Sequence, residues 1–288
     1  MSDPPDTDPS AEPGRRDTDP SGEPGQSNTG SSGEPGQRTL DARVERALDG
    51  VLTPNLAAVR ADVTPTERWF GRLLLCVHDT AAGSPTPAAR AGAAAVELLN
   101  EYHRVRSGLV VQLDNAVAHS LNWDHTDALL AGDAIHATAY RTLDDAALAD
   151  AIDTLTDAST TLTHALDTRV SRPPPPGERT PLLDETVGVL GRSAALVGAS
   201  IAGLDDETRN AVGRFGRGVS VARAGRIAAD TDPGAVRVVP PDTDPDRLRQ
   251  YAADALADAD AALDALADVL DTDPLRAFLD ATVPDADS

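Results

Sequence analysis

The sequence predicts an all-α fold, an antiparallel bundle of about eight or nine helices preceded by an acidic tail. Ala, Leu and Val supply the hydrophobic content while aromatic residues make up only 3 % of the chain, and Ala and Leu are strong helix formers. From residue 39 onward, apolar residues recur at helical spacing. No segment alternates with a period of two, and no Asn-Gly hairpin turn occurs. The 288 residues therefore suit one large helical domain and a tail.

The first 38 residues carry a repeat with a period of eleven. Asp6–Gly14 recurs as Asp17–Gly25 and, more weakly, as Ser31–Gly36. Every unit contains proline and glycine and almost no apolar side chain, so the repeat cannot form a coiled coil and has nothing to bury. We predict a disordered, acidic tail over residues 1–38 and one helical domain over residues 39–288.

Apolar spacing and capping signals place the helices of the domain in order. The first has one apolar face, made of Leu40, Val44, Ala47 and Leu48. The second opens at Thr64-Pro65-Thr66-Glu67, where Thr64 is the expected N-cap, Pro65 takes N1 and Glu67 completes a capping box, and it ends at Gly83.

The proline run at 173–176 divides the helices that follow. These are expected from Pro87 to about Ser107 and over 126–143, 144–170, 181–203, 205–230, 246–270 and 274–283.

The charge pattern narrows the classes of function. The formal net charge is −22, and all 25 basic residues are arginine. An acidic chain without lysine is typical of proteins adapted to molar salt, where the Debye length falls to about 3 Å. No basic stripe with interleaved aromatic residues is present, so we expect no nucleic-acid binding. No apolar run approaches the roughly 20 residues of a membrane span and no signal peptide is recognised, so a cytoplasmic location is expected.

Four segments resemble a known family. They are Ala93–Leu99, then Trp123–Asp133 with its Leu-Ala-Gly-Asp ending, then Arg179–Leu183, and finally Phe215–Val219. In this order and spacing they are similar to the trans-polyprenyl diphosphate synthases, over roughly residues 40–284. The resemblance implies the isoprenoid (terpenoid) synthase fold.

The resemblance also implies a chemistry. An allylic diphosphate ionises, and Mg²⁺ held on two facing Asp-Asp-x-x-Asp boxes stabilises the departing pyrophosphate. Aspartates at positions i, i+1 and i+4 lie on adjoining faces of one helical turn and provide the hard oxygen ligands that Mg²⁺ requires.

Both aspartate boxes are missing from this chain. The first falls on Ser107–Val111, which contains no carboxylate, and the second falls on Ile227–Thr231. Asp230, with Asp232 nearby, is better explained as the end of a helix, like the Asp271–Pro274 turn. The paired arginines expected after the first box map near Ala116-Val117 and are also absent. We therefore predict no catalytic, cofactor-binding or metal-ligating residue, with Mg²⁺ involved only if the protein is an enzyme after all.

Arginines remain just ahead of both lost boxes and in two other segments that resemble the family, and they could bind a diphosphate or another anion without a metal. The alternative is that they pair with the surplus of carboxylates. The candidates are Arg72, Arg104, Arg106, Arg179, Arg223 and Arg226.

Other polar residues give weaker signals. His119 and His125 have no third ligand spaced for a zinc site. Asp144-Asp145 and Asp205-Asp206 are each expected to begin a helix. Carboxylates are favourable there because they interact with the unpaired backbone N–H groups of the first turn.

Three functions stay open. The leading hypothesis is a catalytically degenerate polyprenyl synthase-like protein, a non-catalytic or regulatory subunit or paralogue in isoprenoid biosynthesis that pairs with itself or with an active synthase. The second is a divergent, active prenyltransferase making polyprenyl or geranylgeranyl diphosphate. The third is a metal-free module that binds an isoprenoid or an anion.

Overall fold

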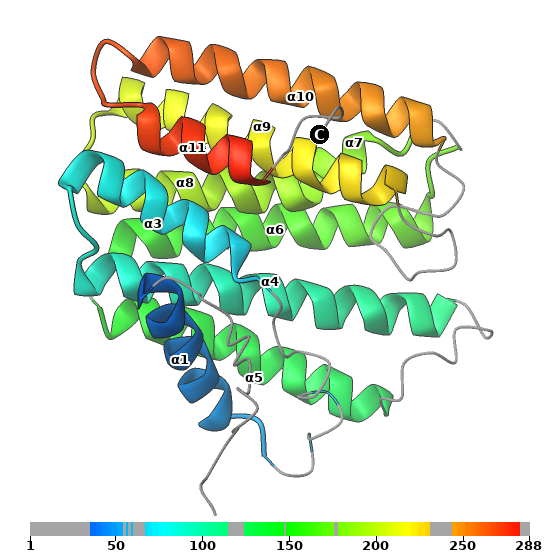
Figure 1. Cartoon of the computed structure of the whole chain (residues 1–288). Coiled ribbons are helices and arrows are strands. Elements are labelled where there is room, and N and C mark those ends of the chain that lie inside the picture. Colours follow the sequence, from blue (N-terminus) through cyan, green and yellow to red (C-terminus); the bar gives the residue numbers. More distant parts are fainter. Residues whose placement is uncertain are drawn as a thin grey trace, which may run out of the picture. The chain divides into compact units, whose positions relative to one another are not determined.

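The computed structural model describes residues 35–53, 56, 59, 67–114, 124–146, 148–175, 178–230 and 244–282, and all regular secondary structure in these ranges is helical (Figure 1). The predicted all-α fold is confirmed. Residues 1–34, most of the predicted tail, lie outside the described part of the chain.

The helices follow the predicted order. They are α1 (Pro35–Asp49), α3 (Trp69–Ala82), α4 (Pro87–Asp114), α5 (His125–Asp144), α6 (Ala149–Ser171), α7 (Pro181–Leu183), the π-helical turn η2 (Asp184–Gly188), α8 (Val189–Ile201), α9 (Asp206–Asp230), α10 (Pro245–Leu266) and α11 (Asp273–Thr282). The expected ends at Gly83 and Asp230 and the start at Asp205 are confirmed within one residue. Asp205 caps α9, because its Oδ1 accepts a hydrogen bond from the backbone N–H of Thr208 at 2.8 Å.

Two helix starts differ from the prediction. Glu67 precedes α3 instead of completing a capping box within it, and Thr64 to Thr66 lie outside the described residues. The N-cap position of α3 is Arg68, which has φ 43° and makes no side-chain capping bond. Asp144 ends α5 and does not begin the next helix, because the backbone closes a turn in which Ala146 and Leu148 both donate to the carbonyl of Leu143.

The small residues of the sequence allow helices to approach closely. Helix α8 packs against both α3 and α9, and α9 packs against α10. A Cβ added to Gly191 in α8 would lie 1.6 Å from Oγ of Ser220 in α9. A Cβ on Gly198 would lie 2.6 Å from the carbonyl oxygen of Leu74 in α3. The glycines therefore set the spacing of the helices that surround the cavity described below.

Helix α1 docks through the apolar face that the sequence predicts. Leu40, Val44 and Leu48 are buried, and α1 packs against α4. Burying these three side chains gives α1 a hydrophobic attachment that does not depend on its charged residues.

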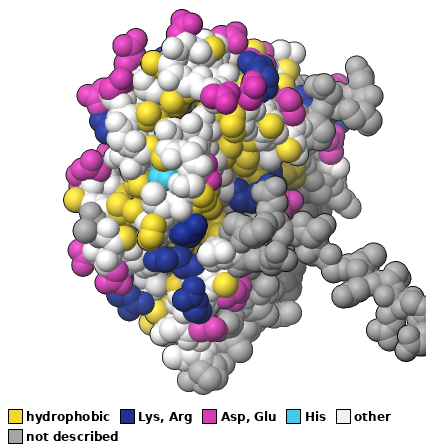
Figure 2. Space-filling model, turned by 60° about the vertical axis from the view of Figure 1, so that its left-hand side comes forward, with side chains coloured by type: hydrophobic (Ala, Val, Ile, Leu, Met, Phe, Trp, Pro, Cys, Tyr) yellow, Lys and Arg dark blue, Asp and Glu magenta, His cyan; other side chains and the backbone are white. Residues whose placement is uncertain are grey.

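The surface reflects the acidic composition. Figure 2 shows one face, on which Asp and Glu side chains are scattered towards the rim and a smaller group of arginines lies among hydrophobic side chains. No helix in the described part of the chain is both long and apolar enough to cross a membrane.

Candidate functional site

A cavity of about 360 Å³ lies among α3, α4, η2, α8 and α9. Its apolar wall comes from Trp69, Phe70, Val187, Leu190 and Ala224. The polar lining is Glu67, Arg68, Glu97, Asn100, Glu101, His103, Arg104, Ser220 and Arg223. Three carboxylates and three guanidinium groups therefore meet in one place.

Two of the carboxylates come from successive turns of α4. Glu97 is only 2 % exposed, and its Oε1 accepts a hydrogen bond from the backbone N–H of Gly71 at 2.6 Å. Burial raises the pKa of Glu97 to about 7, against the opposing effects of the Gly71 hydrogen bond and of Arg68. Burial also raises the pKa of Glu101, while Arg104 and Arg68 act to lower it. Burial therefore shifts Glu97 towards its protonated form.

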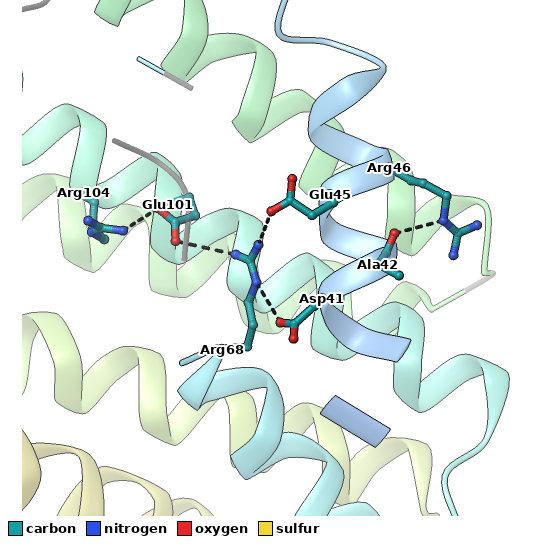
Figure 3. Close-up of polar contacts among 7 residues, drawn as sticks. All are labelled: Asp41, Ala42, Glu45, Arg46, Arg68, Glu101 and Arg104. Carbon is teal, nitrogen blue, oxygen red and sulfur yellow. Dashed lines mark hydrogen bonds and ion pairs between the residues drawn. The ribbon is translucent and has the colours of Figure 1, made fainter. Parts of the chain in front are cut away.

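Arg68 is the central cation of the site. Its side chain is 0 % exposed and lies within ion-pair distance of three carboxylates, Glu45 at 3.4 Å, Asp41 at 3.6 Å and Glu101 at 3.7 Å. Figure 3 shows the guanidinium between α1, which carries Asp41 and Glu45, and α4, which carries Glu101. Burial lowers the pKa of Arg68, and the surrounding carboxylates oppose that shift.

Arg68 is not among the candidate residues predicted from the sequence. Its only signal is its place directly before Trp69, and the capping pattern assigned that stretch to the interior of a helix. The left-handed backbone of Arg68, which turns the chain at the start of α3, is not encoded in any recognisable turn motif.

Two of the predicted arginines line this cavity, and both are paired. Arg104 donates from Nη1 to Oε2 of Glu101 at 2.9 Å. Arg223 forms an ion pair with Glu67, and its guanidinium carbon lies 5.5 Å from the ring centroid of Trp69. Both arginines are therefore paired with acidic side chains that line the cavity.

The other four predicted arginines are not among the cavity-lining residues. Arg106 pairs with Asp133 of α5 at 2.8 Å, and Arg179 donates from Nε to the carbonyl oxygen of Pro174 at 2.7 Å. Arg72 lies on α3, and Arg226 lies on α9 and is engaged in interactions of its own. Of the six candidates, Arg104 and Arg223 line this cavity.

The segment aligned with the first aspartate box lies inside α4 beyond the cavity. Ser107 and Leu109 are buried, and Oγ of Ser107 lies 3.4 Å from Nε2 of His103. Burial, together with the charge of Arg169, lowers the pKa of His103 to about 4, so the imidazole is neutral at pH 7.

The segment aligned with the second box ends α9. Ile227 is half exposed, and Asp230 pairs with Arg249 of α10 at 3.2 Å, as expected for a helix end. Asp232, His119 and Trp123 lie outside the described residues, while His125 is exposed at the start of α5. Among the described residues, no group of three or more His, Cys, Asp or Glu side chains is placed to hold a metal ion.

Comparison with known proteins identifies the fold. No protein-family model matches the sequence, and no curated protein is found to match it. Among solved structures, the chain is similar to a decaprenyl diphosphate synthase from Rhodobacter capsulatus, with a TM-score of 0.68 and 16 % identity over 86 % of this chain and 94 % of that one. A geranyltranstransferase from Methanosarcina mazei gives a TM-score of 0.68 and 16 % identity over 86 % and 96 % of the two chains.

A third similar structure is a heterotetrameric geranyl pyrophosphate synthase from mint, with a TM-score of 0.62 and 17 % identity over 88 % of this chain and 100 % of that one. These matches cover 86–88 % of this chain. The chain therefore has the fold of the trans-prenyl diphosphate synthases.

Proposed function

We propose that this protein is a catalytically inactive protein of the polyprenyl synthase fold, which acts as a non-catalytic or regulatory subunit or paralogue in isoprenoid biosynthesis. The observation that carries the proposal is the pairing inside the cavity. Glu67 pairs with Arg223, and Glu101 pairs with both Arg104 and Arg68. Carboxylates that are engaged with arginines at close range are poor ligands for Mg²⁺, and arginines engaged in this way are less available to a diphosphate.

The chemistry of prenyl transfer supports the same proposal. When pyrophosphate leaves carbon, negative charge develops on its oxygens. Bound cations must stabilise that charge for the reaction to proceed. Where the resemblance would place the first carboxylate box, α4 offers a hydroxyl group at Ser107 and apolar side chains at Leu109 and Val110. These groups cannot supply hard anionic ligands for Mg²⁺.

The second part of the proposal is a partner with the same fold. One similar protein, the mint synthase, is described as heterotetrameric. On α5 of this chain, Leu129 and Leu130 are 40 % and 54 % exposed, and burying them against another subunit would be favourable. The partner is an active prenyl synthase or a second copy of the chain, and the shared compartment is the cytoplasm.

The test is a prenyl transfer assay on the purified full-length protein with isopentenyl diphosphate, an allylic diphosphate and Mg²⁺. We expect no product, while an active polyprenyl synthase in the same buffer produces it. Steady product formation that EDTA abolishes would contradict the proposal and favour a divergent prenyltransferase.

The partner role needs a separate readout. The protein is mixed with an active synthase from the same cell, and complex formation and product chain length are measured. A stable complex with an altered chain length supports a regulatory subunit. If the two proteins do not associate and the chain length is unchanged, the heteromeric partner role fails.

A further inference from the structure

A second hollow, a groove between α4, α5 and α6, shares no lining residue with the cavity described above. Its volume is about 440 Å³, and sites for small molecules usually measure roughly 300–1,000 Å³. Helices α4 and α5 contribute aromatic side chains to one wall, and α6 contributes hydroxyl groups to the other. The two walls therefore offer different chemistry to a ligand.

The aromatic wall is a continuous row of three rings. The ring centroid of His136 lies 4.5 Å from that of Tyr102 and 4.9 Å from that of Tyr140. Burial lowers the pKa of His136, with Asp133 opposing the shift and Arg106 adding to it, so the imidazole is uncharged at neutral pH. The faces of tyrosine rings attract cations. Tyr102 already has one such contact, because the guanidinium carbon of Arg106 lies 5.5 Å from its ring centroid.

The hydroxyl wall offers hydrogen-bond acceptors. Thr156, Thr160 and Thr163 each donate their hydroxyl proton to the backbone carbonyl four residues earlier, at 2.8, 3.0 and 2.8 Å. Because that proton is committed, each of these oxygens has only lone pairs left for the groove. The hydroxyls of Tyr140 and Ser159 lie 2.9 Å apart and share a hydrogen bond, which uses one of their two protons. The wall therefore favours a ligand that donates hydrogen bonds.

The spacing and the charge of the surroundings narrow the ligand further. Thr156 and Thr160 are one helical turn apart, a rise of about 6 Å along α6. Two donor groups joined by a short aliphatic chain can bind both oxygens while the chain packs against the rings. The net charge of −22 attracts a positively charged ligand. Arg106, the cation beside Tyr102, is neutralised by its ion pair with Asp133 at 2.8 Å.

We propose that the groove between α4, α5 and α6 binds a linear aliphatic diamine or polyamine. Its ammonium groups donate hydrogen bonds to the threonine oxygens of α6, and its chain lies against the rings of Tyr102 and Tyr140. This inference goes beyond the proposed function, because it requires neither prenyl transfer nor a protein partner. It therefore stands or falls separately from the absence of prenyl transfer.

Matched substitutions separate the groove from the rest of the surface. Thr156→Val with Thr160→Val removes two acceptor oxygens of the groove and keeps the branched shape of both side chains. The control is Thr154→Val with Thr161→Val on the same helix. Their hydroxyls also donate to the carbonyl four residues earlier, at 2.9 and 3.1 Å, but neither residue lines the groove. Tyr102→Leu removes a ring, and Tyr102→Phe keeps it.

The experiment measures binding of butane-1,4-diamine to the full chain by calorimetry at pH 7 and low salt, with butane-1,4-diol as the uncharged probe of equal length. We expect the diamine to bind and the diol not to bind. The T156V/T160V variant should bind the diamine at least about tenfold more weakly, because two hydrogen bonds to charged groups are lost. Tyr102→Leu should weaken binding at least about threefold. The T154V/T161V and Tyr102→Phe variants should match the unchanged protein.

Several results would overturn the proposal. These are no binding of the diamine, equal binding of the diol, no loss in T156V/T160V or in Tyr102→Leu, or an equal loss in T154V/T161V. Binding that none of the substitutions changes would indicate general attraction to the acidic surface and would overturn it as well. Circular dichroism establishes that each variant is folded. If T156V/T160V fails to fold, the single variants T156V and T160V are measured, and each must weaken binding.

Discussion

Two clusters of ion pairs use the same residue types in different surroundings. In the cavity cluster, Arg68 is 0 % exposed and meets Glu101, whose side chain is 2 % exposed. In the surface cluster, Arg276 of α11 meets Asp260 and Asp264 of α10, with side chains between 45 % and 80 % exposed. Water screens the charges of the surface cluster. The buried charges of the cavity cluster have lost their hydration and are stabilised only by neighbouring groups of the protein. Removing a charge should therefore lower the free energy of unfolding more in the cavity cluster than in the surface cluster.

The largest effect is expected for Arg68→Gln. The substitution leaves Glu101 and Glu97 buried without their common cation, which should lower the free energy of unfolding by about 3–5 kcal/mol. Chemical denaturation at pH 7 measures the change. A loss below about 1 kcal/mol, the range of an exposed pair, would contradict the structural role of Arg68.

Glu97→Gln should produce the next largest effect, and it depends on pH. The pKa of Glu97 is raised to about 7 in the folded protein, so between its ordinary pKa and 7 the folded state holds a proton that the unfolded state has released. Stability therefore falls as the pH rises through this window, and the amide removes that fall. The free energy of unfolding of E97Q, measured relative to that of the unchanged protein, should therefore rise by up to about 3 kcal/mol from pH 4.5 to pH 8.

Unfolding curves at pH 4.5, 6 and 8 provide the measurement for Glu97. Glu185→Gln, at an exposed position of η2, serves as the control for removal of a glutamate charge. A constant difference between E97Q and the unchanged protein at all three pH values would contradict the raised pKa.

The smallest effect is expected for Arg276→Gln in the surface cluster. Loss of these exposed pairs should change the free energy of unfolding by less than about 1 kcal/mol, and the change should shrink further in molar salt. Denaturation at low and high salt checks both statements. A loss as large as that of Arg68→Gln would remove the distinction between the clusters.

The sequence predicted the bundle well because helix order depends on local signals. The apolar spacing of Leu40, Val44 and Leu48 and the acidic cap at Asp205 both report directly on the structure. The start of α3 was predicted wrongly because Thr64-Pro65-Thr66-Glu67 matches a capping box while tertiary packing turns the chain at Arg68 instead.

The site was less predictable for a physical reason. Arg104 and Arg223 were singled out as candidate anion-binding residues and do meet at one cavity. Their partners Glu101 and Glu67 lie on other turns or other segments, so one sequence could not reveal which charges would neutralise them. Arg68 depends on contacts from α1 and α4 together, and no local pattern encodes that arrangement.

The central claim is that the buried carboxylates of α4 neutralise the charge of the arginines beside them. The most direct test is a double-mutant cycle between Arg68 and Glu101. Unfolding free energies of R68Q, E101Q and the double variant should give a coupling of about 1–3 kcal/mol. The same cycle on Arg276 and Asp260 should give about 0.5 kcal/mol or less. Additive effects of Arg68→Gln and Glu101→Gln would contradict the account.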